Sequence, residues 1–155
     1  MARPIAAMSV PGQLGKSIYP AIFAGQVAGR TKRKLGDVFG LQGFGVNLTV
    51  LAPGSVSALR HYHLEQDEFI YILEGNPSLQ LGDEQLLMNP GECFGFRAGE
   101  TIAHQLRNDS DQDVIYLEIG DRVPGDSAEF PNDDIKATFS ADRSWKFTHK
   151  DERDY

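Results

Sequence analysis

The sequence predicts an all-β domain, and three observations support this prediction. Short segments that alternate apolar and polar side chains recur at intervals of about ten residues. Turn-forming residues bound these segments, for example Gly-Asn-Pro at 75–77 and Asn-Pro-Gly at 89–91. Between them, no segment has the 3.6-residue spacing of an amphipathic helix. Because a single sheet of this size would expose its edges and one face, we expect a sandwich or a barrel.

The chain divides into three parts that differ in composition. Residues 1–34 contain scattered Pro and Gly with little periodicity, so we expect an irregular N-terminal arm. Residues 35–125 contain the expected barrel core, and residues 126–155 form a polar C-terminal tail. Aromatic side chains in the tail indicate that it packs on the barrel or on a dimer partner. These aromatic residues are Phe139, Trp145, Phe147 and Tyr155. The expected strands are residues 46–51, 59–64, 68–73, 78–81, 85–88, 93–96, 104–107 and 114–119.

The composition indicates one globular domain that acts on neither membranes nor nucleic acids. The chain has 155 residues, of which 41% are hydrophobic and 24% charged, enough to bury a core. No segment approaches the ~18 consecutive apolar residues that span a bilayer. The N-terminus lacks the apolar core of a signal peptide, so we expect a cytoplasmic protein. A formal net charge of −7 would repel the phosphate backbone of nucleic acids.

Two local features need separate interpretation. The basic residues within 30–34 favour a solvated loop or internal partners for acidic side chains, rather than a nucleic-acid contact. The single cysteine, Cys93, excludes an internal disulfide and a zinc cluster built from cysteines. Its apolar neighbour Phe94 indicates that Cys93 is a small buried side chain.

Two histidines in one expected strand are candidates for a metal site. His61 and His63 lie two residues apart, so both side chains point to the same face of the strand. Leu59 shares that face, which favours the interior. Buried imidazoles need polar partners. A shared metal on Nε2, with the other ring nitrogen hydrogen-bonded, would satisfy both rings, although a pair of satisfied core or surface histidines explains the pair equally well.

Further ligands are expected on neighbouring strands. Glu68 shares its face with Ile70 and Ile72, and His104 shares its face with Leu106. A carboxylate among aliphatic side chains is costly unless a cation holds it. Three imidazoles and one carboxylate would form a mixed site for Mn, Fe, Co, Ni, Cu or Zn. An octahedral ion there would keep two positions for water or substrate.

This set of residues resembles the two sequence motifs of the cupin superfamily. The first motif is matched by Gly54, His61, His63, Glu68 and Gly75, and the second by Gly99, His104 and Asn108. Three departures occur: the Gly54-to-His61 gap is one residue longer than usual, the Gly99-to-His104 gap two residues longer, and Arg97 stands where the second motif usually has proline. Further similarity to small bacterial single-domain cupins covers most of the chain, at residues 34–41, 44–48, 67–75, 116–122 and 147–151.

The resemblance implies a jelly-roll β-barrel, commonly a homodimer, with one divalent transition metal held by His61, His63, Glu68 and His104. It also implies a small polar substrate such as a sugar, sugar phosphate or carboxylate. Some members are described as sugar or sugar-phosphate isomerases, which is the function we expect here. Two alternatives share the same ligands: an Fe-dependent dioxygenase and a non-catalytic sensor that binds a metal and a small ligand.

Substrate-binding and catalytic residues are harder to predict. Glu118 is a candidate base, but the alternation along its strand does not determine whether its side chain points into the barrel or outward. Arg97 and Arg107 could bind phosphate or carboxylate, or could be exposed loop residues. We expect the side chains opposite to the ligands to lie on the outer face; these are Arg60, Tyr62, Tyr71 and Gln105. His149 is expected to be a tail residue without a role.

Overall fold

Most of the regular secondary structure consists of antiparallel strands. A computed structural model describes residues 3–155 of the chain. The strands are β1 (Gln13–Leu14), β2 (Arg30–Lys34), β3 (Phe44–Leu51), β4 (Tyr62–His63), β5 (Glu68–Glu74), β6 (Ser78–Leu81), β7 (Glu84–Leu87), β8 (Cys93–Phe96), β9 (His104–Arg107), β10 (Val114–Asp121), β11 (Ser127–Glu129), β12 (Lys136–Phe139) and β13 (Trp145–Thr148). The short helical segments are η1 (Ala7–Ser9), α1 (Ala21–Ala24), η2 (Gly25–Val27) and α2 (Leu35–Val38). The all-β prediction is confirmed.

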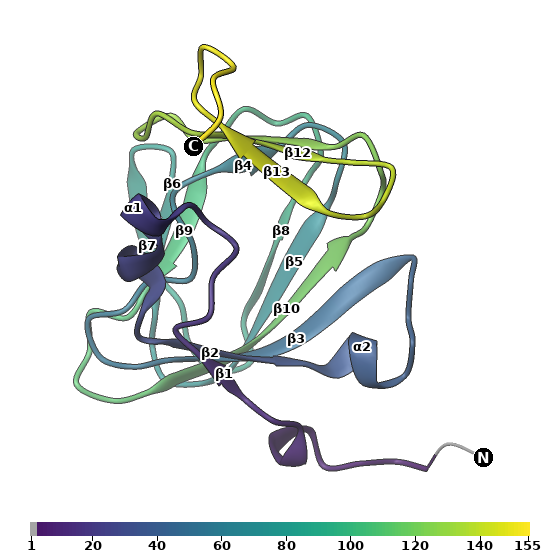
Figure 1. Ribbon diagram of the computed structural model, residues 1–155. Coiled ribbons are helices and arrows are strands. Elements are labelled where there is room, and N and C mark those ends of the chain that lie inside the picture. Colours follow the sequence, from purple (N-terminus) through teal and green to yellow (C-terminus); the bar gives the residue numbers. More distant parts are fainter. Residues whose placement is uncertain (1–2) are drawn as a thin grey trace.

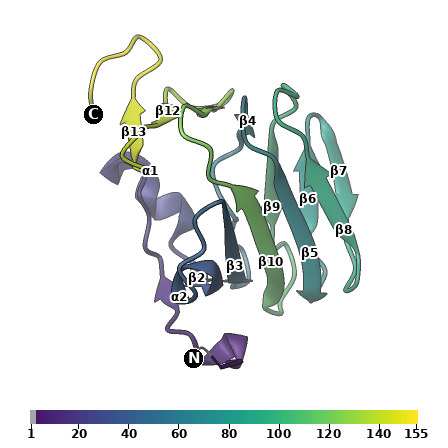
Figure 2. The same cartoon turned by 90° about the vertical axis from the view of Figure 1, so that its right-hand side faces the viewer.

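Three sheets form the walls of a jelly-roll barrel (Figure 1). The largest has the order β1-β2-β3-β10-β5-β8, the second β13-β12-β11-β4 and the third β7-β6-β9. Figure 2 shows α1 and β13 on one side of the barrel and the β6–β7 hairpin on the opposite side. Strands distant in sequence are neighbours in this order, so residues from both halves of the chain meet inside the barrel.

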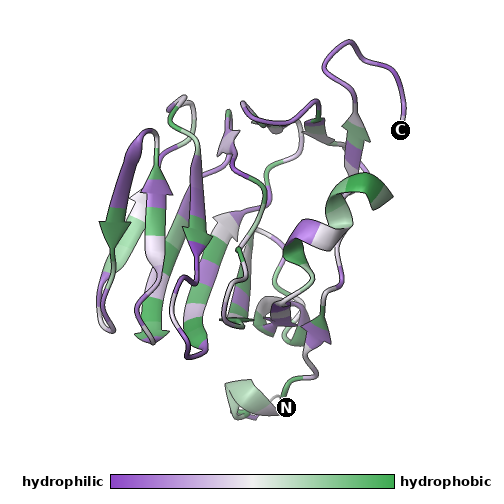
Figure 3. Cartoon of the chain, turned by 90° about the vertical axis from the view of Figure 1, so that its left-hand side faces the viewer, coloured by the Kyte–Doolittle hydropathy of each residue, from purple (hydrophilic) through white to green (hydrophobic). Residues whose placement is uncertain are grey.

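Alternation along the strands determines which side chains enter the core. In β5, Ile70 and Ile72 are buried, whereas Phe69, Tyr71 and Leu73 are exposed. Figure 3 shows the matching bands of hydrophilic and hydrophobic residues along the strands. The main core cluster consists of Leu51, Ile70, Ile72, Leu79, Met88, Leu106, Val114 and Tyr116. The predicted inward face of this strand is therefore confirmed.

The N-terminal segment contributes to the barrel more than its sequence suggests. Residues 30–34, which we expected within an irregular arm, form β2 and pair with β3 from Arg30↔Leu51 to Lys34↔Asn47. The side chains of β2 are mostly charged, so the strand lacks the apolar alternation by which strands are recognised. The reading of these residues as a solvated loop is wrong, whereas an internal acidic partner does exist for Lys32.

The C-terminal segment also packs on the barrel. Strands β11, β12 and β13 join β4 in the four-stranded sheet. Trp145 and Phe147 pack against a second core cluster, which consists of Leu59, Ala128, Phe130, Ile135 and Ala137. The tail thereby forms part of the wall next to His63 on β4.

Cys93 departs from the prediction, because its side chain is exposed rather than buried. Cys93 pairs with Tyr71 across β8 and β5, and Tyr71 also faces outward. Its neighbour Phe94 points to the opposite face and packs against the core. In a strand, an apolar neighbour therefore indicates nothing about the burial of the next residue. Among the described residues, no helix has the length and apolar character needed to cross a membrane.

The two glycines of the first motif allow a stability test. Both have positive φ, +77° at Gly54 and +79° at Gly75. A Cβ at Gly54 would meet nothing within 4 Å, whereas one at Gly75 would lie 2.7 Å from the Asp113 carbonyl oxygen. We expect Gly54→Ala to cost about 1–2 kcal/mol of unfolding free energy from backbone strain. Gly75→Ala should cost roughly 1–3 kcal/mol more because of the steric clash. Urea unfolding followed by circular dichroism measures both, and equal losses would contradict this account.

Candidate metal centre

Two segments position His61 and His104. His61 immediately precedes β4, and His104 begins β9. Their backbones exchange hydrogen bonds, from His61 N to His104 O at 3.2 Å and from His104 N to His61 O at 2.8 Å. The two ring centroids lie 4.7 Å apart. The pairing therefore fixes both imidazoles inside the barrel before any ligand binds.

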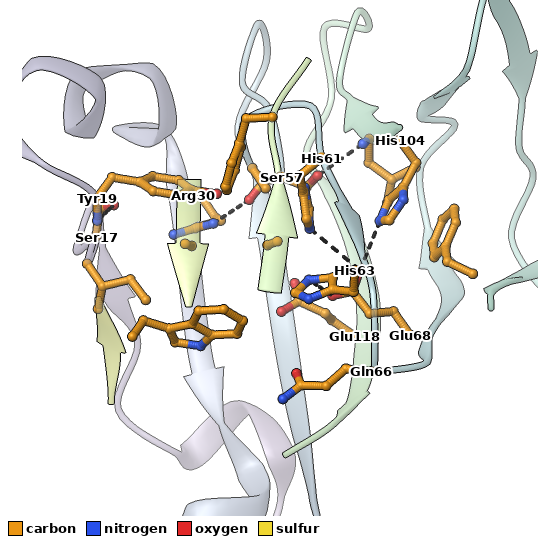
Figure 4. A pocket seen from close by; sticks show the side chains of 18 of the residues that line it. Ser17, Tyr19, Arg30, Ser57, His61, His63, Gln66, Glu68, His104 and Glu118 are labelled. Carbon is orange, nitrogen blue, oxygen red and sulfur yellow. Dashed lines mark hydrogen bonds and ion pairs between the residues drawn. The ribbon is translucent and has the colours of Figure 1, made fainter. Parts of the chain in front are cut away.

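The carboxylate of Glu68, at the start of β5, lies at the centre of the site (Figure 4). Its Oε2 lies 2.9 Å from His104 Nε2 and 3.5 Å from His61 Nε2. Its Oε1 lies 3.7 Å from His63 Nε2. All three imidazoles thus direct the same nitrogen, Nε2, toward one carboxylate.

The opposite ring nitrogens determine what Nε2 can do. His61 Nδ1 lies 2.7 Å from the Leu59 carbonyl oxygen, which can only accept, so Nδ1 carries the proton. His63 Nδ1 lies 2.5 Å from Asp126 Oδ2. In the neutral tautomers, both Nε2 lone pairs therefore face the oxygens of Glu68. Acceptors that converge in this way require a cation or additional protons between them.

The donor set fits a divalent transition metal. Ligand atoms of His61, Glu68 and His104 lie within 4.8 Å of one another. His63 does not belong to this compact group, although it faces Glu68 from the other side. Imidazole nitrogens with one carboxylate oxygen suit Mn, Fe, Co, Ni, Cu and Zn. His104 differs from the other rings because its Nδ1 is buried and finds no hydrogen-bond partner in the described part of the chain. Its ring stacks on Phe96 at a centroid distance of 3.6 Å.

The electrostatics of the site favour a deprotonated ligand set. Burial alone would raise the pKa of Glu68, but the hydrogen bond from His104 and the nearby His61 and His63 hold this pKa well below its ordinary value. Burial lowers the pKa of His104, which keeps that imidazole neutral near pH 7. Burial also acts to lower the pKa of His63, but the hydrogen bond to Asp126 and the charge of Glu68 raise it overall. Protons therefore compete with a metal mainly at His63.

Asp126 was not recognised from the sequence. It is fully buried, and besides accepting from His63 it accepts a hydrogen bond from the Glu65 backbone N–H at 2.8 Å. It lies 63 residues beyond His63 in the chain, just before β11. The β4–β11 pairing brings the two together. No local pattern in the sequence indicates this contact, although a buried aspartate beside a histidine is a common orienting partner of metal ligands.

A cavity of about 230 Å³ opens from this site into the barrel. Beyond the histidines and Glu68, charged and hydroxyl-bearing side chains line it: Tyr19, Arg30, Lys32, Tyr116 and Glu118. Glu118 thus faces the interior, which resolves the orientation that its sequence left open. Its Oε1 accepts a hydrogen bond from Lys32 Nζ at 2.6 Å. Burial alone would raise the pKa of Glu118, but the Lys32 charge lowers it overall, so the carboxylate is ionised.

The other predicted candidates do not line this cavity. Arg107 pairs with Asp109 at 3.1 Å on the surface, and Arg97 lines a second pocket that shares His63, Glu68 and His104 with the first. The side chains predicted to face outward have different environments. Tyr71 is exposed, and Tyr62 lines the second pocket. Arg60 donates to the Gly82 carbonyl, and Gln105 donates to the Ala58 carbonyl. His149 lies in the C-terminal segment, where it pairs with Asp134 and stacks on Tyr155.

Comparison with known proteins agrees with this architecture. Residues 47–120 match the family described as Cupin domain. The crystal structure of a sugar phosphate isomerase from a cupin superfamily, from Silicibacter pomeroyi, is 36% identical, with a TM-score of 0.91 over 99% of this chain and 96% of that chain. A proposed sugar phosphate isomerase from Acidithiobacillus ferrooxidans is 28% identical, with a TM-score of 0.72 over 81% of this chain and 80% of that chain. No curated protein matches the chain.

A third structure, the polyketide cyclase RemF from Streptomyces resistomycificus, shares the fold at 22% identity and a TM-score of 0.64, over 78% of this chain and 80% of that chain. An antiparallel jelly roll with histidines and a glutamate gathered in its interior defines a cupin barrel. The chain belongs to the cupin superfamily. The family predicted from the sequence is therefore confirmed.

The contact between His63 and Asp126 can be tested against a matched pair on the surface. Asp126→Asn keeps the shape of the side chain but removes the charge that orients His63. We expect metal affinity to fall by about 10–100-fold, the usual effect of losing such a partner. Asp134→Asn makes the same change at exposed His149 and should leave the affinity unchanged. Competition with a chelator for Zn²⁺ measures both variants, and wild-type affinity in Asp126→Asn would contradict the assignment.

Proposed function

We propose that this protein is a metal-dependent enzyme that isomerises a small hydroxy-carbonyl compound of the sugar or sugar-phosphate class. The proposal assigns His61, His63, Glu68 and His104 as ligands of one divalent transition metal. One observation favours it most: a second carboxylate, Glu118, lines the same cavity as the three histidines and Glu68. The likeness to the isomerase from Silicibacter pomeroyi supports the same class of reaction. The expected homodimer and cytoplasmic location stay predictions.

His63 would complete the ligand set as the fourth donor. Its Nε2 lies 3.7 Å from Glu68 Oε1, and Asp126 holds its Nδ1. A short movement of the His63 ring or of the carboxylate would bring it into the group that the other three residues already form. The backbone of β4, which carries His63, pairs with β11 and limits such a movement to the side chains.

Glu118 has the properties of a base for this reaction. A bound divalent metal would polarise the substrate carbonyl and acidify the adjacent C–H bond. Glu118 would accept that proton and return it to the former carbonyl carbon, while the neighbouring hydroxyl proton passes to the former carbonyl oxygen. Lys32 stabilises the ionised form through Oε1. Tyr116 OH donates to Oε2 at 3.3 Å. Figure 4 shows Glu118 beside Glu68, below the ring of His63.

Deuterium exchange tests this function directly. Metal-loaded protein is incubated in D₂O with a panel of aldoses, ketoses and their phosphates, and NMR follows the carbon next to the carbonyl. We expect isomer formation with deuterium incorporated at that carbon for at least some members of the panel. Glu118→Gln should retain its metal but lower kcat by about 10²–10⁴-fold, as expected for loss of a general base.

The control for this experiment is Glu74→Gln, which alters an exposed carboxylate on β5. This variant should keep wild-type turnover. Full activity in Glu118→Gln would exclude Glu118 as the base. Absence of exchange across the whole panel by fully metal-loaded protein would contradict the isomerase proposal and favour a binding role.

A further inference from the structure

Arg30 is a buried cation whose partners are all neutral. It is only 8% exposed, at the start of β2, and it lines the cavity. Its Nη1 donates to the Ser57 carbonyl, and its Nη2 lies 3.5 Å from the Lys16 carbonyl. Its Nε is buried and has no partner among the residues that the structure describes. In the part of the chain that the structure describes, no carboxylate lies within ion-pair distance of its guanidinium. Lys32, two residues along the same face, is by contrast paired with Glu118.

The charges around the cavity indicate which kind of ligand would pair with Arg30. Arg30 and Lys32 are its cationic side chains, and Glu68 and Glu118 its anionic ones. These charges balance, and the buried carboxylate of Asp126 beside His63 adds one negative charge. A divalent metal at the histidines would still leave an excess of positive charge in the cavity. A desolvated guanidinium without a counter-ion is costly. Among oxyanions, phosphate and carboxylate match the geometry of the guanidinium best.

We infer that Arg30 is the anion-binding residue of this cavity. Its ligand is a small molecule that carries a phosphate or carboxylate group at one end and metal-binding oxygens at the other. Figure 4 shows Arg30 and the histidine cluster on opposite sides of the cavity, with Ser57 between them. The inference that one end of the ligand carries metal-binding oxygens rests on the proposed metal-dependent function. The inference that the other end is anionic rests on Arg30 alone.

The other arginines near the cavity do not line it. Arg107 already has the carboxylate of Asp109 as its partner, and Arg97 lines a second pocket that shares His63, Glu68 and His104 with the first. Arg33, on the same strand as Arg30, also has buried guanidinium nitrogens without a partner among the described residues, but it points to the opposite face of the strand. Arg33 therefore provides a matched control, because it carries the same charge on the same strand but outside the proposed subsite.

Calorimetry with defined probes tests the inference. Inorganic phosphate, glucose 6-phosphate, gluconate and uncharged glucose are titrated into metal-loaded wild type, Arg30→Gln, Arg30→Lys and Arg33→Gln. We expect the wild type to bind inorganic phosphate and at least one of the charged sugars more tightly than glucose. Arg30→Gln should raise the Kd of the bound anions at least tenfold, and Arg30→Lys should raise it less. Arg33→Gln should stay within twofold of wild type.

The pattern among the probes identifies the anion. Preference for glucose 6-phosphate over gluconate indicates a phosphate subsite, and the reverse preference indicates a carboxylate subsite; both support the inference. Anion Kd values in folded Arg30→Gln within twofold of wild type would overturn it. Equal binding of glucose and all anions by the wild type would also overturn it.

A measurement on the wild type covers the case in which Arg30→Gln does not fold. Crystals soaked in tungstate, a phosphate analogue with a strong anomalous signal, should show tungsten within contact distance of the Arg30 guanidinium. Tungsten bound only outside the cavity, or none bound at all, would overturn the inference.

Metal-free protein separates this inference from the proposed function. Phosphate binding that depends on Arg30 after treatment with EDTA supports the anion subsite, even if the loaded protein isomerises nothing. Conversely, isomerase turnover combined with anion binding that does not depend on Arg30 would overturn the anion subsite but not the proposed function.

Discussion

The site depends on a single carboxylate inside the barrel, Glu68, which faces the Nε2 atoms of three imidazoles. An ionised carboxylate among apolar side chains is stable only where cations or hydrogen-bond donors surround it. Glu68 lies on β5, and the imidazoles around it come from β9, from β4 and from the residue just before β4, so all three sheets contribute to the site. Because His61 donates through Nδ1 to a carbonyl oxygen, its Nε2 lone pair must point toward the carboxylate. This lone pair and the carboxylate repel each other unless a cation lies between them, so the arrangement requires a cation at its centre.

From this centre, the cavity continues toward a second set of charged groups on β2 and β10. Lys32 and Glu118 form an ion pair at 2.6 Å, and Arg30 has no carboxylate partner within residues 3–155. The cavity thus combines the candidate metal centre, a carboxylate suited to proton transfer and a cationic end. A substrate that satisfies all three would carry oxygens at one end and an anionic group at the other. Sugar phosphates and sugar acids have this chemistry, and neutral sugars lack its anionic part.

Much of the fold and the core of the site could be predicted from the sequence. The alternation that places Glu68 with Ile70 and Ile72 is a local property of one strand, and the structure buries both isoleucines. The same reasoning placed His61 with Leu59, which is also buried. What the sequence did not reveal depends on contacts between distant segments. Asp126 reaches His63 only through strand pairing.

The β2 strand shows a different limit of sequence analysis. Arg30 and Lys32 point inward, yet a strand with charged inward residues gives no apolar signal and resembles a solvated loop. Their positions become meaningful only when Glu118 is seen on the inner face of the same sheet, two strands away on β10. In both cases, the unpredicted residues are polar groups whose partners lie far away in the chain. Local patterns therefore identified the proposed metal ligands but not the residues proposed to orient them or to bind the substrate.

The central claim is that His61, Glu68 and His104, with His63, hold a divalent metal inside the barrel. Elemental analysis of the purified wild type, His61→Ala and His149→Ala tests it most directly, with all three dialysed under identical conditions. The account predicts about one equivalent of transition metal in the wild type and in His149→Ala, and loss of most of it in His61→Ala. Equal metal content in folded His61→Ala and the wild type would contradict it.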